Sequence, residues 1–253
     1  MRALLISDIH ANLPALEAVL AAAPPYDAVW NLGDVVGYGA SPNEVVVLAR
    51  RLGGIVVRGN HDRACSGIMP FSQFRDFSSL AASAVCWTQG VLTNENTEWL
   101  ATLRRGPVWA IPRKVQCVHG APNDEDEYVF LEGDAWAALY GSRARIVFCG
   151  HTHRQGGWSL HRLEVTSLKP AYQSSACAEQ FELPLEKGWR YLINPGSVGQ
   201  PRDGDSRAAF AVYDEAKSVL TWHRVPYKVL TAQRRIRRAE LPEVLATRLR
   251  EGK

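Results

Sequence analysis

The sequence predicts an α/β protein, and three features of its pattern indicate this class. Five short apolar runs end on glycine or polar residues, which is typical of strands that are covered on both faces. Segments with helical periodicity lie between several of these runs. Later in the chain, two alternating segments around the turn EAKS predict a β-hairpin.

The predicted strands lie within the first 150 residues, and a polar group follows each of them. The five strands are Ala3–Ile6, Ala28–Leu32, Ile55–Val57, Val115–Val118 and Ile146–Cys149. The segments that follow these strands are, in the same order, SDIH, GD, RGNHD, HG and GHTH. Because ligands of open α/β sheets bind at the carboxyl ends of the strands, these polar segments are the first candidates for a site.

Helical patterns and turns complete the expected single domain of residues 1–253. Pro14–Ala22 and Pro42–Leu52 each carry proline in their first turn, and Ser41 is the expected N-cap of the second helix. Two amphipathic helices, at 78–92 and 94–103, are predicted inside a helical insertion at about 64–106. The hairpin comprises 208–214 and 219–225, and a helical tail follows at about 226–253.

The composition is that of a soluble globular protein, with 46% hydrophobic and 22% charged residues. A net charge of +3 is too small to favour nucleic acid or a membrane as partner. The five cysteines form no CxxC pair, and neither a signal peptide nor an apolar run of about 18 residues is present. We therefore expect a reduced, cytoplasmic protein, and the pattern makes no prediction of its oligomeric state.

Seven possible metal ligands follow the five strands. They are Asp8, His10, Asp34, Asn60, His119, His151 and His153. A tetrahedral zinc takes four ligands, so seven favour two metal ions that share one carboxylate. Oxygen and nitrogen donors without cysteine favour Mn, Fe, Zn, Ni or Co. A single Asp after a strand is usually a turn residue, but chance does not explain five such strand ends. His161 and His223 have no neighbouring ligands in the sequence and are interpreted as structural.

The ordered motifs resemble those of the calcineurin-like metallophosphoesterase superfamily, especially its small bacterial and archaeal phosphodiesterase branch. They are SDIHANLPALEAVL, NLGDVVGYG, RGNHDRA, CVHGAPND and FCGHTHR, and with NPGSVGQPRDGD they frame residues 4–205. The resemblance implies a four-layer fold, in which two mixed β-sheets lie between helices and a dinuclear metal centre lies at one edge.

The resemblance also implies a role for each ligand. One ion would be held by Asp8, His10 and His153, the other by Asn60, His119 and His151, and Asp34 would bridge both. Manganese is the first choice of metal, with iron, nickel, zinc and cobalt as alternatives. In this superfamily a hydroxide that bridges the metals is the nucleophile.

Other residues of the motifs are predicted to serve catalysis or substrate binding. The resemblance implies that His61 lies near the leaving group as a general acid and that Asp62 holds its ring, a contribution of about 10²–10⁴-fold. Asn12, Arg63 and Arg202 could contact substrate, or could instead cap or pair with neighbouring groups. Tyr38 and the aromatic loop 68–77 could line the pocket, but packing in the core is the preferred interpretation.

Departures from the family pattern narrow the predicted substrate to a small phosphoester. Protein phosphatases and diadenosine tetraphosphatases of the superfamily typically show GDxxDRG and GNHE, whereas this chain has GDVVGYG and GNHD. The difference favours a phosphodiesterase, with a phosphomonoesterase as the near alternative. A non-catalytic scaffold is disfavoured because all seven ligands and His61 are present, and a nuclease because no basic aromatic patch lies near the motifs.

Overall fold

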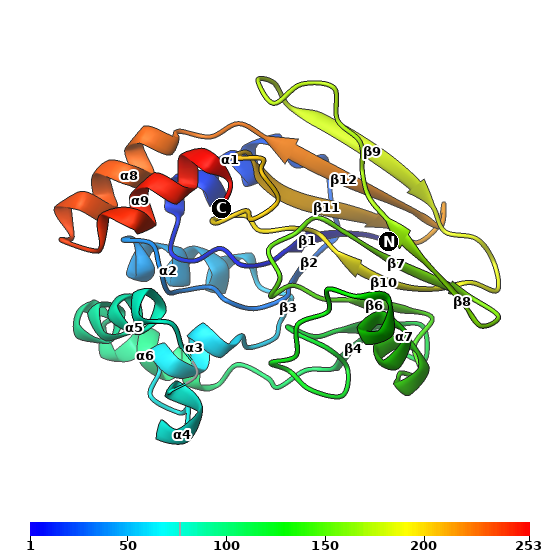
Figure 1. Ribbon diagram of the computed structural model, residues 1–253, viewed down its shortest axis with the longest axis horizontal. Helices are drawn as coiled ribbons and strands as arrows, with labels where there is room; N and C mark the ends of the chain where they lie inside the picture. The colour runs from blue at the N-terminus through cyan, green and yellow to red at the C-terminus, as the bar shows by residue number, and fades with distance from the viewer. Residues whose placement is uncertain (76) are drawn as a thin grey trace.

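Two six-stranded sheets form the centre of the computed structural model, which describes residues 1–75 and 77–253 (Figure 1). The first sheet contains β3 (Ile55–Val56), β2 (Ala28–Asn31), β1 (Arg2–Ile6), β11 (Ala208–Asp214), β12 (Val219–Val225) and β9 (Glu179–Pro184), in that spatial order. The second contains β4 (Val108–Ile111), β5 (Val115–Cys117), β6 (Ile146–Phe148), β10 (Arg190–Asn194), β7 (Gly156–His161) and β8 (Glu164–Leu168). Both sheets are mixed, since β1 and β10 each pair with one parallel and one antiparallel neighbour.

Helices cover the outer faces of both sheets. The structure contains α1 (Leu13–Ala22), α2 (Pro42–Leu52), α3 (Asn60–Cys65), α4 (Phe71–Phe74), α5 (Ser79–Val91), α6 (Asn94–Ala101), α7 (Glu132–Gly141), α8 (Val229–Arg238) and α9 (Glu243–Glu251). Helices α1 and α2 share a core cluster with β1 and β11, whereas α7 shares one with β6 and β10. In Figure 1, α8 and α9 lie side by side at one end of the molecule, where they pack with α5 around Tyr38.

The alternation of side chains in β1 explains why its sequence is a continuous apolar run. Leu4 and Ile6 pack against the helices, while Ala3 and Leu5 point into the core between the two sheets. Both faces of the strand are therefore buried, as the sequence predicts for this type of run. The two sheets between helices confirm the predicted fold class.

The predicted elements with local sequence signals agree closely with the structure. The bounds of α2, β11 and β12 match their prediction, and the five early strands match within two residues. Ser41 is the N-cap residue of α2, as expected, but its side chain makes no capping hydrogen bond and instead accepts one from Arg235 Nη1 at 2.6 Å. One residue of the predicted insertion, Asp76, lies outside the described residues.

Two expectations about composition can be compared with the structure. All five cysteines are free, in agreement with the absence of a disulfide pattern. Among the described residues, no helix combines the length and apolar character that crossing a membrane requires.

Candidate metal centre

The seven predicted ligands come together where the ends of the two sheets meet. Asp8 and His10 follow β1, Asp34 follows β2, and Asn60 begins α3 just after β3. The other three follow strands of the second sheet, with His119 after β5 and both His151 and His153 after β6. Except for Asn60, which is partly buried, each of these residues is at most 4% exposed. Most of the ligand side chains are therefore buried at the ends of the two sheets.

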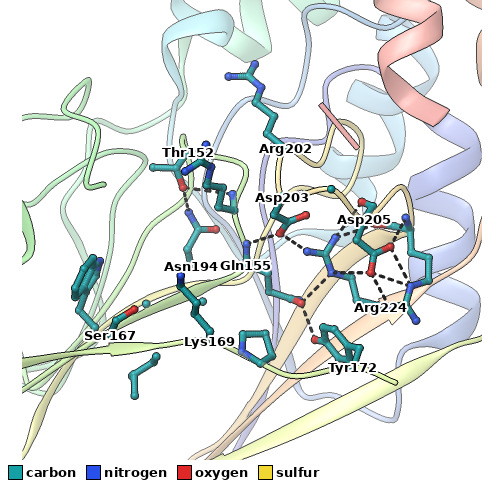
Figure 2. Close-up of a pocket in the computed structure, with 18 of the residues that line it drawn as sticks. Thr152, Gln155, Ser167, Lys169, Tyr172, Asn194, Arg202, Asp203, Asp205 and Arg224 are labelled. Carbon is teal, nitrogen blue, oxygen red and sulfur yellow. Dashed lines mark hydrogen bonds and ion pairs between the residues drawn. The ribbon is translucent and has the colours of Figure 1, made fainter. Parts of the chain in front are cut away.

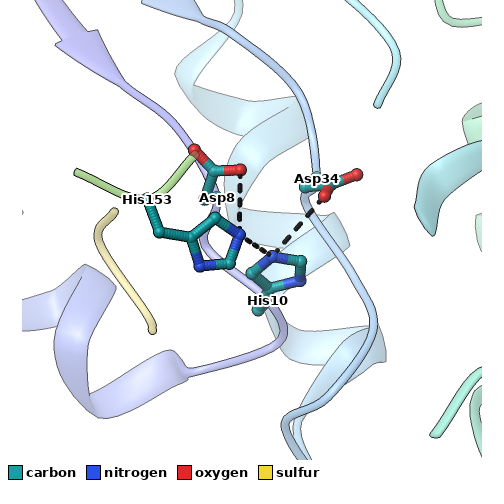
Figure 3. A group of neighbouring side chains, drawn as sticks. All are labelled: Asp8, His10, Asp34 and His153. Atoms are coloured by element: carbon teal, nitrogen blue, oxygen red, sulfur yellow. Dashed lines mark hydrogen bonds and ion pairs between the residues drawn. The ribbon is translucent and has the colours of Figure 1, made fainter. Parts of the chain in front are cut away.

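The ligand atoms form two groups that share the carboxylate of Asp34. The first group contains Asp8, His10, Asp34 and His153, and its ligand atoms lie within 4.8 Å of one another (Figure 3). The second contains Asp34, His119 and His151. Asp34 Oδ2 lies 3.5 Å from His10 Nε2 and 3.4 Å from His119 Nε2. A carboxylate between two sets of donors is the arrangement that a pair of metal ions requires.

Each of the four histidines hydrogen-bonds a backbone carbonyl through one ring nitrogen. His10 Nδ1 contacts Val36 O at 3.1 Å, His119 Nδ1 contacts Leu32 O at 2.8 Å, His153 Nδ1 contacts Gln200 O at 2.6 Å, and His151 Nε2 contacts Asp126 O at 3.0 Å. A carbonyl only accepts, so the nitrogen facing it carries the proton, and in the neutral ring the other nitrogen carries a lone pair. This is the usual arrangement of metal-ligating histidines, whose tautomer and orientation the outer hydrogen bond sets.

Several atoms of the cluster have no satisfactory partner within the protein. His10 Nε2 and His153 Nε2 lie 3.0 Å apart, and the carbonyl bonds make both of them lone-pair atoms. Two lone pairs at this distance repel each other, and a cation bound to both nitrogens removes the repulsion. Asn60 Oδ1 and His119 Nε2 are buried without a hydrogen-bond partner. The residues present therefore fit divalent cations.

The charges within the cluster are also those of a metal site. Burial lowers the pKa of His10, His151 and His153 well below the usual value, which keeps these rings in the neutral form that binds metal. Burial opposes the charge of Asp34, but His119 and His61 hold its pKa well below the usual value. Burial likewise opposes the charge of His119, but Asp34 raises its pKa to about 10. Metal binding must therefore displace a proton from His119.

The backbone at five of the ligands adopts the left-handed region of conformational space. The φ angles are 51° at Asp8, 48° at His10, 55° at Asp34, 67° at His151 and 58° at His153. Asp and His enter this region more readily than most residues, but such backbone still costs about 1–3 kcal/mol per residue. Strain of this kind concentrates at functional sites, and here it turns consecutive strand-end residues toward one point.

Asp62 supports the loop of Asp34 and does not hold the ring of His61. Its carboxylate accepts hydrogen bonds from the backbone N–H groups of Asp34, Val35, Val36 and Gly59, at 2.8–3.2 Å. His61 Nδ1 is buried without a hydrogen-bond partner, so the predicted contact between Asp62 and this ring is wrong. The resemblance to the superfamily implied this contact, but both oxygens of Asp62 accept hydrogen bonds from backbone amides instead.

His61 is instead positioned by aromatic rings. Its ring centroid lies 4.4 Å from that of Tyr38, 5.0 Å from that of Phe77 and 4.9 Å from that of His10. Burial lowers the pKa of His61 to about 4. Gly37, at φ +90°, has no room for a Cβ because that atom would collide with His61 Nδ1. Tyr38 and Phe77 are thus part of the packed core, as preferred from the sequence, and they also fix the orientation of His61.

Two of the three predicted substrate contacts have structural partners instead. Asn12 caps α1 through Ala15 N and donates to Gly199 O at 2.8 Å, so its amide is engaged within the fold. Arg63 pairs with Asp126, and its Nη1 lies 3.4 Å from Glu125 Oε1, which fastens α3 to the loop after β5.

Arg202 is the third predicted substrate contact, and its guanidinium forms no ion pair with a carboxylate of the described residues. Its guanidinium lies 5.6 Å above the Tyr38 ring, and its Nη2 donates to Gln200 Oε1 at 2.9 Å. Its Nε is buried without a hydrogen-bond partner. Arg202 therefore remains a candidate contact.

The loop between His119 and α7 contributes more to the site than its sequence indicates. The ring of Tyr128 stacks on His151, with centroids 3.8 Å apart and planes at 17°. The ring of Phe130 in turn stacks on that of Tyr128, with centroids 5.4 Å apart. Only two aromatic residues without periodicity marked this loop in the sequence, and nothing in their spacing pointed to His151. The stack limits how the His151 ring can move.

His161 and His223 lie outside both ligand groups, as expected. His161 stacks on Trp189 at a centroid distance of 4.9 Å, and His223 stacks on Phe210 at 4.5 Å. Both rings serve packing.

Comparisons with known proteins agree with this geometry. An uncharacterized protein of Methanocaldococcus jannaschii is 35% identical over 259 residues, which span 98% of this chain and 97% of the relative. The crystal structure of a metallophosphoesterase from Sphaerobacter thermophilus is similar with a TM-score of 0.84 at 39% identity, covering 100% of this chain and 99% of that one. A symmetrical bis(5'-nucleosyl)-tetraphosphatase of Baumannia cicadellinicola is 30% identical over 171 residues, or 56% of this chain and 59% of the relative.

The model of the calcineurin-like phosphoesterase superfamily domain matches residues 1–218. This match includes every predicted ligand and His61. The chain is therefore a metal-dependent hydrolase of phosphoric esters that belongs to the calcineurin-like phosphoesterase superfamily.

Proposed function

We propose that this hydrolase is a phosphodiesterase that works with two divalent metal ions, of which manganese is the first candidate. The observation that carries the proposal is the shared cluster, in which two groups of buried ligands meet at Asp34. The carbonyl bonds of the four histidines support it further, because the neutral form of each ring then has its lone pair on the nitrogen that does not face the carbonyl.

The proposed division of ligands follows the two groups. Asp8, His10 and His153 would hold one ion, Asn60, His119 and His151 the other, and Asp34 would contact both. Two divalent ions bound there would acidify a water molecule and neutralise charge on the phosphoryl oxygens.

The protein's own residues prepare this chemistry. The negative charge of Asp34 offsets part of the repulsion between two neighbouring cations. The rings of Tyr38 and Phe77 hold His61 in one orientation beside His10. From there, we propose, His61 donates a proton or a hydrogen bond to the departing oxygen, a contribution of about 10²–10⁴-fold.

The segment after Asp34 supports a diester rather than a monoester. In the chain's GDVVGYG motif, Tyr38 occupies the position of the arginine in the phosphatase pattern GDxxDRG. Its ring packs against His10 and His61, so an uncharged group lies where that pattern places a cation. The lack of that arginine departs from the phosphatase pattern, and this departure favours the phosphodiesterase branch of the superfamily.

Turnover by metal-depleted protein reconstituted with Mn²⁺ tests the proposal. Bis(p-nitrophenyl) phosphate and p-nitrophenyl phosphate serve as the diester and the monoester. We expect metal-dependent turnover that favours the diester. Asn60→Ala should bind less metal, whereas His61→Ala should keep its metal and lose about 10²–10⁴-fold in kcat. His161→Ala, outside the ligand groups, is the matched control and should behave as the unmodified protein.

Two results would change the assignment. A preference for p-nitrophenyl phosphate would identify a phosphomonoesterase, the near alternative. Absence of turnover with Mn²⁺, Ni²⁺, Co²⁺ and Zn²⁺, in protein that binds two ions, would refute general phosphodiesterase activity and favour a scaffold of the same fold.

A further inference from the structure

A cavity of about 860 Å³ adjoins the candidate metal centre (Figure 2). Thr152, which lies between His151 and His153 in the chain, lines the cavity, and its hydroxyl accepts a hydrogen bond from Asn194 Nδ2 at 3.0 Å. Arg202 also lines the cavity, and its backbone N–H donates to His153 O at 3.1 Å. The wall of the cavity is therefore continuous with the loop that carries two ligands. Its volume lies in the range of ligand sites, about 300–1,000 Å³.

Part of the charge in the cavity wall is neutralised within the protein. The buried Arg207 donates to both carboxylate oxygens of Asp205 and to Glu179, and the buried Arg224 pairs with Asp203. Figure 2 shows this network around Asp203, Asp205 and Arg224 on one side of the cavity. These two arginines stabilise the wall of the cavity. Their charges are neutralised by the carboxylates, so they contribute little to binding an anionic ligand.

Three other cations of the lining have no such partner. Arg154, Lys169 and Arg202 form no ion pair with any carboxylate in residues 1–75 and 77–253. Arg154 lies 5.1 Å above the ring of Phe130 and Arg202 lies above the ring of Tyr38. In Figure 2 the Arg202 side chain extends away from the network of Asp203, Asp205 and Arg224. The cavity thus keeps a positive charge beside the metal centre.

The rest of the lining suits an organic group that joins two anions. Phe130, Trp158 and Tyr172 present aromatic surface, and the Thr152 and Ser167 side chains add polar groups. A phosphoryl group at the metal centre would have one ester arm directed past Arg202 into this space. The unpaired Arg154 and Lys169 would recognise an anion on that arm, and arginine binds phosphate with two parallel hydrogen bonds.

We propose that the cavity binds a second phosphate group, carried by one alcohol arm of the diester substrate. The substrate class is then phosphodiesters of phosphorylated alcohols, such as esters of nucleoside bisphosphates. This inference rests on the phosphodiesterase function proposed above.

A matched pair of chromogenic diesters tests the inference. The p-nitrophenyl ester of thymidine 5′-phosphate and its 3′-phosphorylated derivative share the leaving group and differ only in the second phosphate. For Mn²⁺-loaded protein, we expect kcat/KM to be at least about tenfold higher for the phosphorylated ester, mainly through a lower KM. In the double variant Arg154→Gln/Lys169→Gln, this ratio should fall toward one. Arg162→Gln, in the exposed turn between β7 and β8 outside the cavity, should keep the ratio.

The two proposals fail in different ways. Equal kcat/KM for both esters in the unmodified protein would overturn the cavity assignment and leave the phosphodiesterase intact. Hydrolysis of neither ester would count against the phosphodiesterase function. Binding of thymidine 3′,5′-bisphosphate, measured by calorimetry, would then test the cavity assignment without relying on turnover. Weaker binding of this probe by the double variant than by Arg162→Gln would support the cavity, and equal binding would overturn it.

Discussion

The substitution Asp62→Asn tests whether Asp62 supports the loop of Asp34. The carboxylate is fully buried, and each of its oxygens accepts two backbone N–H groups. Asparagine has one carbonyl oxygen, so it can keep two of the four hydrogen bonds. Its NH₂ group would face the other two amides, donor against donor.

The hydrogen bonds give the size of the expected effect. A hydrogen bond to a charged group contributes about 1.5–3 kcal/mol, so losing two lowers the free energy of unfolding by at most roughly 3–6 kcal/mol, because burial opposes the charge of Asp62 and raises its pKa to about 7. The same change loosens the segment 34–36, so we also expect weaker metal binding. Glu17→Gln is the matched control, because Glu17 is exposed and a surface change from carboxylate to amide costs at most about 0.5 kcal/mol.

Urea unfolding of the metal-depleted protein, followed by circular dichroism and tryptophan fluorescence together, measures this free energy. The kcat of the Mn²⁺-loaded variants is measured in parallel. If Asp62→Asn keeps its stability within about 1 kcal/mol of the unmodified protein but loses as much kcat as His61→Ala, the supporting role is refuted. Asp62 would then act on His61 after all.

Three further predictions concern the metal centre and a distant histidine. In Gly59→Ala the new Cβ would collide with the carboxylate of Asp34, so metal analysis should find fewer than two ions per chain; two retained ions would contradict this. Burial lowers the pKa of His223 from 6.5 to about 4, so the unfolded chain takes up the proton first and stability falls as the pH drops from 6.5 to 4. In urea titrations of metal-free protein, His223→Phe should reduce this fall by about 2–3 kcal/mol, and an unchanged pH slope would count against it. Mn²⁺ at about 100 times its Kd should add about 2.7 kcal/mol of stability per independent site, whereas an unshifted unfolding midpoint would argue against binding.

The ligands of the candidate site were predictable because the signal for each is local. A buried strand fixes where its last residue lies, and parallel neighbours bring their ends to one edge. Asp8 and Asp34 follow the parallel neighbours β1 and β2, so their meeting follows from strand ends alone, whereas His119 follows β5 of the second sheet and reaches them through the packing of the two sheets. The bounds of α2 and of the hairpin β11–β12 were predictable for the same reason, since period and turn residues mark them.

The interactions that surround the ligands were not predictable in this way. Asp62 binds amides more than 20 residues earlier in the chain, and Arg63 pairs with Asp126 more than 60 residues later. Neither the partner nor the direction of such a side chain is set by sequence spacing. Strand β9 was missed because its residues, EQFELP, alternate between half-buried and exposed positions and lack an apolar run. The cavity was missed because several separate segments of the chain build it.

Anomalous diffraction from crystals of the Mn²⁺-loaded protein tests the central claim most directly. We expect two manganese peaks on opposite sides of Asp34. One should contact Asp8, His10 and His153, and the other Asn60, His119 and His151. A single peak, or peaks that do not share Asp34, would contradict the two-ion centre.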